Sequence, residues 1–257
     1  MHNRGMVKSF FILLIIATLG TAAVILTTGQ KGEIRVAVAS NFRDAIKEVS
    51  ARFEAKTDHK VTLIFGSTGK HYAQIINGAP FDIFFAADIR RPELLENEGM
   101  ALTGSRFTYA AGKLVLWSAQ AGYVDPDGML LEEKDFRHLA IANPQLAPYG
   151  RAAQEVLQAR GVWDELRERL VRGENINQAF QFVISGNAEL GFVAYSQVKQ
   201  SVQSAEGSWW EVPQTLYTPI EQQAVLLKDS EVGRAFLAFV QSEEAREIIR
   251  GFGYTTP

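Results

Sequence analysis

The chain has 257 residues, of which 47% are hydrophobic and 21% are charged, and these values are ordinary for a globular protein with a sizeable core. The formal net charge is −3, so nothing indicates a nucleic acid or an acidic membrane surface as a partner. The chain has no cysteine, which excludes thiol catalysis, disulfides, thiolate-bound zinc and a lipidated N-terminal cysteine.

The N-terminal segment is typical of an export signal. Residues 1–9 include Arg4 and Lys8, and an apolar run follows from residue 10 to residue 26. This run is also long enough to reach the lower limit for a membrane span. We therefore expect residues 1–31 to be a signal peptide or an N-terminal membrane anchor. In both cases the remaining chain would lie outside the cytoplasmic membrane.

Predicted strands and helices alternate in the next part of the chain. Residues 33–40 form a short apolar run rich in β-branched side chains, which is typical of a buried parallel strand. Residues 42–56 place apolar side chains at helical spacing. The same patterns predict strands at 61–66 and 81–87 and a helix at 70–77. This order predicts a doubly wound α/β domain with right-handed crossovers.

A second α/β region follows the first. The sequence predicts strands at 113–117, 139–142 and 190–194, helices at 151–160 and 177–185, a polar aromatic loop at 204–214, a returning strand at 218–227 and helices within 231–250. The economical interpretation is two lobes joined by two crossing strands. Lobe I would comprise residues 32–112 plus 218–257, and lobe II residues 113–217. A cleft between two such lobes is a natural ligand site.

Four predicted helix starts carry small or hydroxyl-bearing residues. They are Ser40-Asn41, Ser67-Thr68-Gly69, Tyr149-Gly150 and Asn175-Ile176. Helix N-termini have unsatisfied backbone N–H groups and about half a positive elementary charge, so each of them can hold an anion. None of these turns contains Lys or Arg. Together they predict an uncharged cage for a small anion.

Each turn also has a purely structural interpretation. Ser40 and Asn41 are residue types that commonly cap helices. Residues 143–150, with two prolines and a glycine, fit an ordinary strand-to-helix loop. Residues 65–70 lack the G-x-x-x-x-G-K-[ST] spacing of a phosphate-binding loop, so ATP hydrolysis is not expected there. Lys70 is expected to be a solvated charge.

Enzymatic interpretations find little support in the sequence. The four histidines form no H-x-x-x-H pair, and no G-x-S-x-G sequence is present. We therefore predict no catalytic residues, although an exported enzyme of unknown reaction remains an alternative. A transcriptional effector domain is disfavoured because the N-terminus resembles an export signal and not a DNA-binding helix pair.

Five strings in order along the chain carry a family resemblance. They are VAVASNF (36–42), FGSTGK (65–70), GAPFDIFFAAD (78–88), ANPQLAPYG (142–150) and ENINQAFQFVISGNAELGFVAYSQV (174–198). Together they resemble the periplasmic molybdate-binding proteins of ABC transporters. The resemblance covers almost the whole chain from residue 33 to residue 252. It implies a type II periplasmic-binding-protein fold, with two doubly wound α/β lobes that are joined by crossing hinge strands and close over a bare tetrahedral oxyanion.

The resemblance also implies which residues bind the ligand. In the first lobe, the family's hydroxyl donors and their neighbours correspond to Ser40, Asn41, Ser67 and Thr68. In the second lobe, its main-chain donors correspond to Tyr149 and Ile176. These residues would hold molybdate or tungstate through its oxygens. In one branch of the family a tyrosine hydroxyl closes the site, but that position here is Ala194. Tyr195 is one residue later and would face the other side of a strand, so it is not assigned.

The resemblance implies an extracytoplasmic solute-binding protein of the periplasm, either free or tethered by its N-terminal segment. As a monomer it would deliver molybdate, and tungstate, to the membrane permease of an ABC importer. No resident cofactor, enzymatic activity or nucleic-acid partner is expected. The alternative is a binding protein of the same fold for another anion, such as sulfate, thiosulfate, phosphate or an organic anion.

Overall fold

The computed structural model describes residues 31–202 and 207–257. The predicted signal or anchor at residues 1–31 therefore lies outside the described residues, except for Lys31. Lys31–Pro257 forms one compact unit. Within the two described ranges, no helix is both long and apolar enough to cross a membrane.

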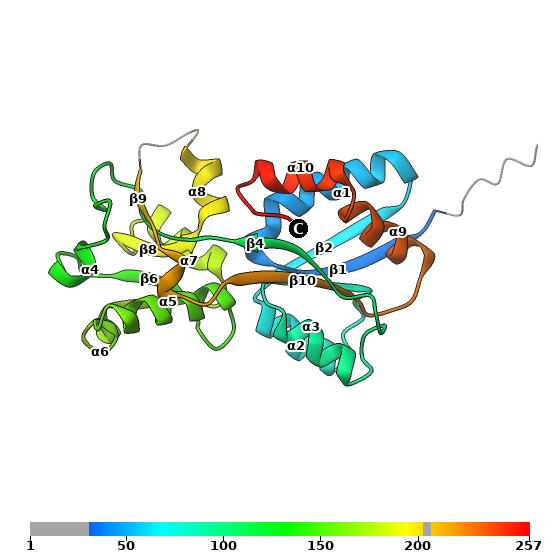
Figure 1. The fold of residues 1–257 in the computed structure, drawn as a ribbon, viewed down its shortest axis with the longest axis horizontal. Helices are drawn as coiled ribbons and strands as arrows, with labels where there is room; N and C mark the ends of the chain where they lie inside the picture. Colours follow the sequence, from blue (N-terminus) through cyan, green and yellow to red (C-terminus); the bar gives the residue numbers. More distant parts are fainter. Residues whose placement is uncertain (1–30, 203–206) are drawn as a thin grey trace, which may run out of the picture. The chain divides into compact units, whose positions relative to one another are not determined.

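The first sheet has five strands in the order β2-β1-β3-β10-β4 and lies on the right of Figure 1. Its strands are β1 (Glu33–Ala39), β2 (Lys60–Gly66), β3 (Ile83–Ala86), β4 (Phe107–Gly112) and β10 (Ile220–Leu226). β1 pairs in parallel with β2 and β3, whereas β10 pairs antiparallel with β3 and β4. The sheet is therefore mixed, with its parallel strands coming from the first part of the chain.

Helices cover both faces of the first sheet (Figure 1). The first group comprises α1 (Arg43–Thr57), α9 (Glu231–Val240) and α10 (Glu243–Gly251), and the short 3-10 helix η1 (Ser40–Phe42) directly precedes α1. The second group comprises α2 (Thr68–Ile76) and α3 (Arg90–Asn97). Alternate strand residues face the two groups, because Val36 and Val38 pack with the first and Ala37 packs with the second.

The second sheet has the order β7-β6-β8-β5-β9. Its strands are β5 (Leu114–Ser118), β6 (Leu139–Ala142), β7 (Leu170–Gly173), β8 (Leu190–Ala194) and β9 (Ser208–Glu211). β6 pairs in parallel with β7 and β8, and β5 pairs antiparallel with β8 and β9. The accompanying helices are α4 (Leu130–Glu133), α5 (Pro148–Ala159), α6 (Trp163–Leu166), η2 (Arg167–Arg169), α7 (Ile176–Ile184), α8 (Tyr195–Val202) and η3 (Gln214–Leu216).

The chain crosses between the sheets twice (Figure 1). β4 continues through Lys113 into β5, and the chain returns from β9 through η3 into β10. The α/β fold class is confirmed by these two layered sheets. The lobe boundaries at residues 112/113 and 217/218 stay a prediction, because the described chain forms a single compact unit.

The predicted loop at 204–214 is wrong in part, because β9 forms an edge strand there and pairs Trp210 with Leu116. The polar residues around Trp210 hid this strand, since only one of its four side chains is buried. The elements α3, β4 and β7 were also not predicted from the sequence. In α3 only Pro92 and Leu95 are buried, so its apolar pattern is too sparse to indicate a helix.

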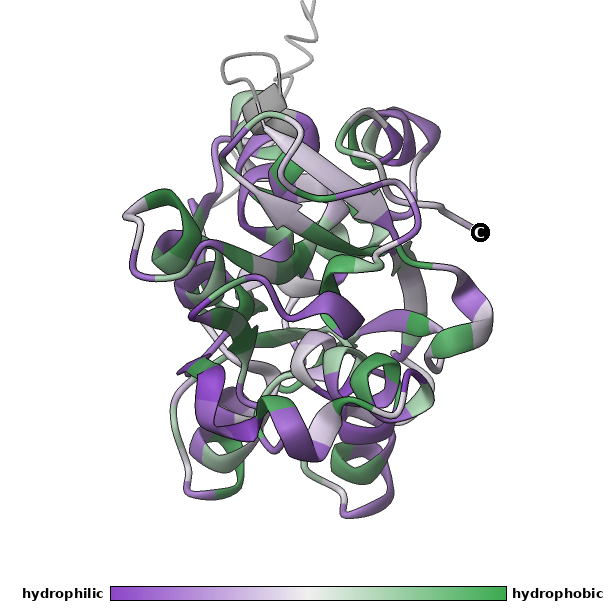
Figure 2. Cartoon of the chain, turned by 90° about the vertical axis from the view of Figure 1, so that its left-hand side faces the viewer, coloured by the Kyte–Doolittle hydropathy of each residue, from purple (hydrophilic) through white to green (hydrophobic). Residues whose placement is uncertain are grey.

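The core of each region lies between its sheet and the covering helices. Figure 2 shows hydrophobic strands in the interior and helices whose outward sides are hydrophilic. All residues of β3, β6 and β8 are buried. Fully burying a large aliphatic or aromatic side chain stabilises a fold by about 1.5–3 kcal/mol. The buried strands therefore hold the turns at their ends in fixed positions.

Candidate anion-binding site

The four predicted turns follow the ends of two pairs of parallel strands. In the pairing of β1 with β2, Ala39 lies opposite Gly66. In the pairing of β6 with β7, Ala142 lies opposite Gly173. Each of the four residues ends its strand at the carboxyl side. Because such ends meet at one edge of a parallel sheet, each pair of turns is brought side by side.

All six predicted binding residues line one small pocket, to which both sheets contribute. They are Ser40, Asn41, Ser67, Thr68, Tyr149 and Ile176. The remaining lining residues are apolar or uncharged, so none of the Lys, Arg, Asp and Glu residues in the described ranges borders the pocket. Its volume is about 10 Å³, which is on the order of the space that one water molecule needs. The pocket is therefore narrow.

The turns of the first sheet present hydroxyl groups. Ser67 caps α2, where its Oγ accepts a hydrogen bond from the Lys70 N–H at 3.3 Å. The Thr68 Oγ1 accepts a hydrogen bond from the Ala87 N–H at 3.0 Å. In both cases the hydroxyl is an acceptor, so its own proton is left to donate to a ligand.

Ser40 does not cap the helix that follows it. Neither η1 nor α1 has a side-chain cap, so the interpretation of Ser40 and Asn41 as helix caps alone is wrong. The Ser40 Oγ instead donates to the Asn175 Oδ1 of the opposite turn at 3.1 Å. This bond joins the first-sheet half of the pocket to the second-sheet half.

Asn41 faces the core with its side chain. Its Nδ2 donates to the Gln222 Oε1 at 2.7 Å and to the Tyr254 hydroxyl at 3.2 Å. Both amide protons are used in this way. Asn41 can therefore serve an anion through its main-chain N–H and not through its amide.

The turns of the second sheet present main-chain groups. Pro148 is the first residue of α5 and has no N–H, so the Tyr149 N–H is the first donor of that helix. Asn175 caps α7, and its Oδ1 accepts from the N–H groups of Asn177 at 3.0 Å and Gln178 at 3.2 Å. The cap leaves the Ile176 N–H unused, and such an N–H has no acceptor within its helix.

Three further contacts close the two halves over the pocket. The Gly69 N–H donates to the Leu146 carbonyl at 2.8 Å, and Arg91 Nη2 donates to the Gln145 carbonyl at 3.2 Å. A Cβ at Gly69 would lie 3.0 Å from the Leu146 Cα, so only glycine permits this approach without a shift. Lys70 pairs with Glu174 at 2.9 Å and its side chain is exposed, so the prediction of a solvated charge is confirmed.

The two residues at the family's tyrosine position lie away from the pocket. Ala194 ends β8, and its N–H donates to the Gln197 Oε1 at 3.0 Å. Tyr195 lies against Gly253, and the Lys113 Nζ is 5.8 Å from its ring centroid. Neither Ala194 nor Tyr195 borders the pocket.

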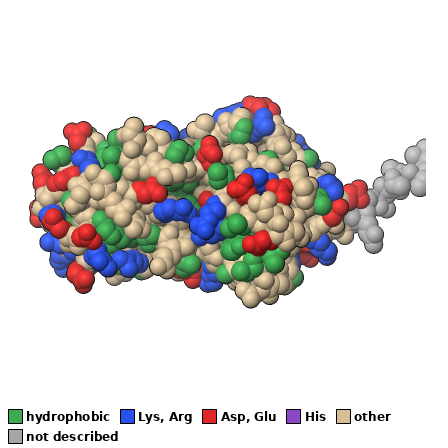
Figure 3. Space-filling model, turned by 60° about the horizontal axis from the view of Figure 1, so that its bottom comes forward, with side chains coloured by type: hydrophobic (Ala, Val, Ile, Leu, Met, Phe, Trp, Pro, Cys, Tyr) green, Lys and Arg blue, Asp and Glu red, His purple; other side chains and the backbone are tan. Residues whose placement is uncertain are grey.

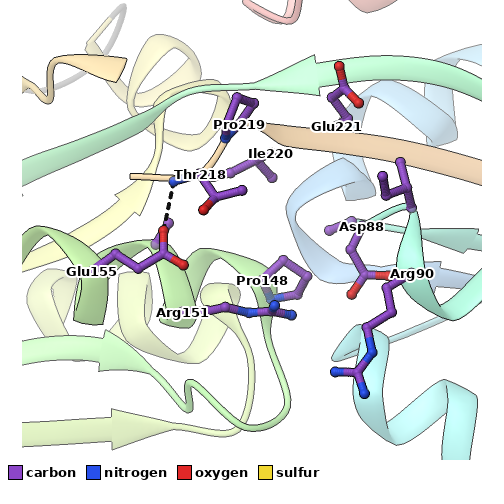
Figure 4. Close-up of a pocket in the computed structure, with 12 residues that line it drawn as sticks. Asp88, Arg90, Pro148, Arg151, Glu155, Thr218, Pro219, Ile220 and Glu221 are labelled. Atoms are coloured by element: carbon purple, nitrogen blue, oxygen red, sulfur yellow. Dashed lines mark hydrogen bonds between the residues drawn. The ribbon is translucent and has the colours of Figure 1, made fainter. Parts of the chain in front are cut away.

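A larger cleft of about 260 Å³ adjoins the pocket and shares Ala87 and Pro148 with it. Figure 4 shows Arg90 and Arg151 on opposite sides of it, and the Glu155 carboxylate accepting from the Thr218 N–H at 2.7 Å. On the face shown in Figure 3, Lys and Arg side chains gather near the middle of the molecule. The charged residues of the cleft are partly or fully exposed and of both signs, so the cleft lacks the uncharged character of the pocket.

His71 lies directly beneath the Gly66 turn. Its Nε2 donates to the Val38 carbonyl at 3.2 Å, and its Nδ1 lies 3.1 Å from the Gln74 Oε1. Burial lowers the pKa of His71, and the two hydrogen bonds oppose this effect. Within residues 31–202 and 207–257, no group of three or more His, Asp or Glu side chains could hold a metal cation.

Comparisons with known proteins identify the family of the chain. A family model described as bacterial extracellular solute-binding protein matches residues 34–255. The molybdate-binding protein ModA of Azotobacter vinelandii is 49% identical over 249 residues, covering 96% of this chain and 98% of that protein. ModA of Rhodobacter capsulatus is 51% identical over 228 residues, covering 88% of this chain and 89% of that protein.

A solved structure confirms the predicted fold. The periplasmic molybdate-binding protein of Azotobacter vinelandii superposes with a TM-score of 0.83 at 44% sequence identity. The match covers 87% of this chain and 99% of that one. The chain therefore belongs to the bacterial extracellular solute-binding proteins, in the family of the ModA molybdate-binding proteins.

Proposed function

We propose that the protein binds molybdate, and tungstate, in the pocket between the two sheets and delivers it to the membrane permease of an ABC importer. One observation carries this proposal. The six residues predicted from the sequence line a single uncharged pocket, at four helix starts that come from two different sheets. The names of the Azotobacter and Rhodobacter relatives support molybdate as the ligand.

The donor set suits an oxyanion that carries no proton. The donors available to a ligand are hydroxyls and main-chain N–H groups, and the Asn175 Oδ1 already accepts three hydrogen bonds. Each bond from such a donor to an anion is charge-assisted and stronger than a neutral one. A protonated phosphate would also need an acceptor for its own O–H. With no Lys or Arg to supply charge, fit sets the selectivity, because a smaller ion such as sulfate leaves donors unpaired.

The remaining predictions belong to the same proposal. The protein would act in the periplasm as a monomeric binding protein without catalytic activity, and it would need no resident cofactor. Closure of the two halves would present the loaded form to the permease. The Lys70–Glu174 ion pair would strengthen the closed form, whereas the Ser40 hydroxyl would turn its single proton from the Asn175 Oδ1 to the anion.

A calorimetric titration of the purified protein with molybdate, tungstate, sulfate and phosphate tests the proposal. We expect sub-micromolar dissociation constants for molybdate and tungstate, which correspond to about −8 kcal/mol or better. We expect little competition from sulfate at equal concentration. Equal affinities for sulfate and molybdate would favour the alternative, a binding protein of the same fold for another anion.

A further inference from the structure

A buried hydrogen-bond network lies behind the pocket and is centred on Gln222 of β10. Gln222 has no exposed surface. Its Oε1 accepts hydrogen bonds from the Asn41 Nδ2 at 2.7 Å and from the Tyr109 hydroxyl at 3.1 Å. A side chain on a strand that connects the two sheets is therefore bonded to a residue that lines the pocket.

The backbone around Gln222 is irregular in a way that serves this network. β10 pairs Gln222 with Ala110 and then Gln223 with Thr108, so Tyr109 is an extra residue in β4. A bulge of this kind redirects side chains, and here it accompanies the bond from Tyr109 to Gln222. Gln222 is therefore held by the bulge as well as by Asn41.

Asn41 is fixed from a second direction by the C-terminal segment. The Tyr254 hydroxyl donates to the Asn41 carbonyl at 2.7 Å, and it lies 2.9 Å from the Ser196 Oγ. Asn41 is thus held through both its side chain and its carbonyl, and its main-chain N–H is the donor that the proposed function assigns to the ligand. Small changes in this network would move that N–H.

The other end of Gln222 faces Tyr149, which contributes to the second-sheet half of the pocket. A Cβ at Gly112 would overlap the Tyr149 hydroxyl oxygen and would lie 2.8 Å from the Gln222 Nε2, so both atoms lie against Gly112. Both atoms are buried, and neither has a hydrogen-bond partner of regular geometry among the described residues. An amide N–H and a phenol oxygen are a complementary donor and acceptor.

We propose that Gln222 is a positioning residue for the oxyanion site, because it links the Asn41 turn of the first sheet to Tyr149 of the second. This inference rests on the proposed function. Gln222 touches no ligand itself. It sets the distance between the main-chain N–H groups of Asn41 and Tyr149. Gln222 can do so because it lies on β10, a strand about which the two sheets would move.

Three substitutions test the role of Gln222. Gln222→Met removes both polar ends at similar volume, and Tyr149→Phe removes only the hydroxyl and keeps the main-chain donor. Gln223→Met is the matched control. Gln223 is the next residue of β10, and its amide bonds Arg106 at 2.9 Å and Thr108 at 3.1 Å, away from the pocket. Each variant is titrated with molybdate, and its ligand-free form is unfolded with urea.

We expect Gln222→Met to weaken molybdate binding roughly 10-fold and Tyr149→Phe a few-fold, the scale of one lost hydrogen bond. The loss should appear as faster dissociation with an almost unchanged association rate. The double variant should bind about as weakly as Gln222→Met alone, because both changes break one link. Gln223→Met should lower stability and leave the affinity within about 2-fold.

Two results would overturn the inference. In the first, Tyr149→Phe binds molybdate as tightly as the wild type, and Gln222→Met loses no more molybdate affinity than Gln223→Met does. The other is strictly additive losses in the double variant, which would show two independent structural effects. Variants that bind like the wild type would refute the positioning role alone, whereas a wild-type protein that binds none of the four oxyanions would refute the proposed function as well.

Discussion

The two halves of the pocket are built on equivalent strand ends but offer different donors. The first-sheet turns add the side-chain hydroxyls of Ser40, Ser67 and Thr68 to their main-chain groups. The second-sheet turns offer main-chain N–H groups at the starts of α5 and α7. A side-chain donor is lost by one substitution, but a main-chain donor is lost only when its helix start moves. The two halves should therefore respond differently to mutation.

The largest effect should come from deleting the hydroxyls of the first half. Ser40→Ala together with Thr68→Ala should weaken molybdate binding by about 2–6 kcal/mol, at about 1–3 kcal/mol for each donor lost. Calorimetric titration measures this loss.

The matched control for this double variant is Ser50→Ala with Thr62→Ala. These hydroxyls lie on α1 and β2 outside the pocket. The control should leave the affinity unchanged. Equal affinity in the Ser40/Thr68 variant and the control would show that the anion binds elsewhere.

The second half should respond to loss of a helix cap. Asn175→Ala removes the acceptor for Asn177, Gln178 and Ser40. We expect the free energy of unfolding to fall by about 1 kcal/mol, the usual value of an N-cap, and the affinity to fall with it. Urea unfolding and titration test the two effects. Normal affinity despite the lost stability would mean that the position of the Ile176 N–H does not depend on the cap.

The first half should show a pH effect near neutrality that depends on His71. Burial lowers the pKa of His71 from the usual value of 6.5, so the unfolded chain binds more protons than the folded one. The stability of the neutral form is therefore present above about pH 6.5 and is lost as the pH falls through the folded pKa. His138, in the second half, is exposed.

The free energy of unfolding at about pH 7.5 and about pH 5.5 tests this effect. The difference between the two values should be larger for the wild type than for His71→Gln. An equal difference in both proteins would assign the pH dependence to other groups.

The smallest effect should come from Ile176→Val. The donor at this position is a main-chain N–H, and valine keeps it, so the affinity should change by less than about 2-fold. A loss as large as that of the hydroxyl variants would contradict the assignment of main-chain donors to the second half.

Local signals in the sequence located the pocket, whereas contacts between distant residues were not predictable. Strand ends and helix starts are visible within a few residues, so the turns at Ser40, Thr68 and Ile176 were predicted correctly as places in the fold. The bond from Asn41 to Gln222 joins residues 181 positions apart, and no short pattern indicates it. The edge strand around Trp210 was missed for a similar reason, since its burial depends on pairing with β5.

A crystal structure of the molybdate complex, with anomalous scattering measured at the molybdenum edge, tests the central claim most directly. The proposed function predicts one anomalous peak in the pocket, near the Ser40 and Thr68 hydroxyls and the Tyr149 and Ile176 N–H groups. The molybdate oxygens should lie about 2.7–2.9 Å from these donors. A peak in the neighbouring cleft, between Arg90 and Arg151, would contradict it.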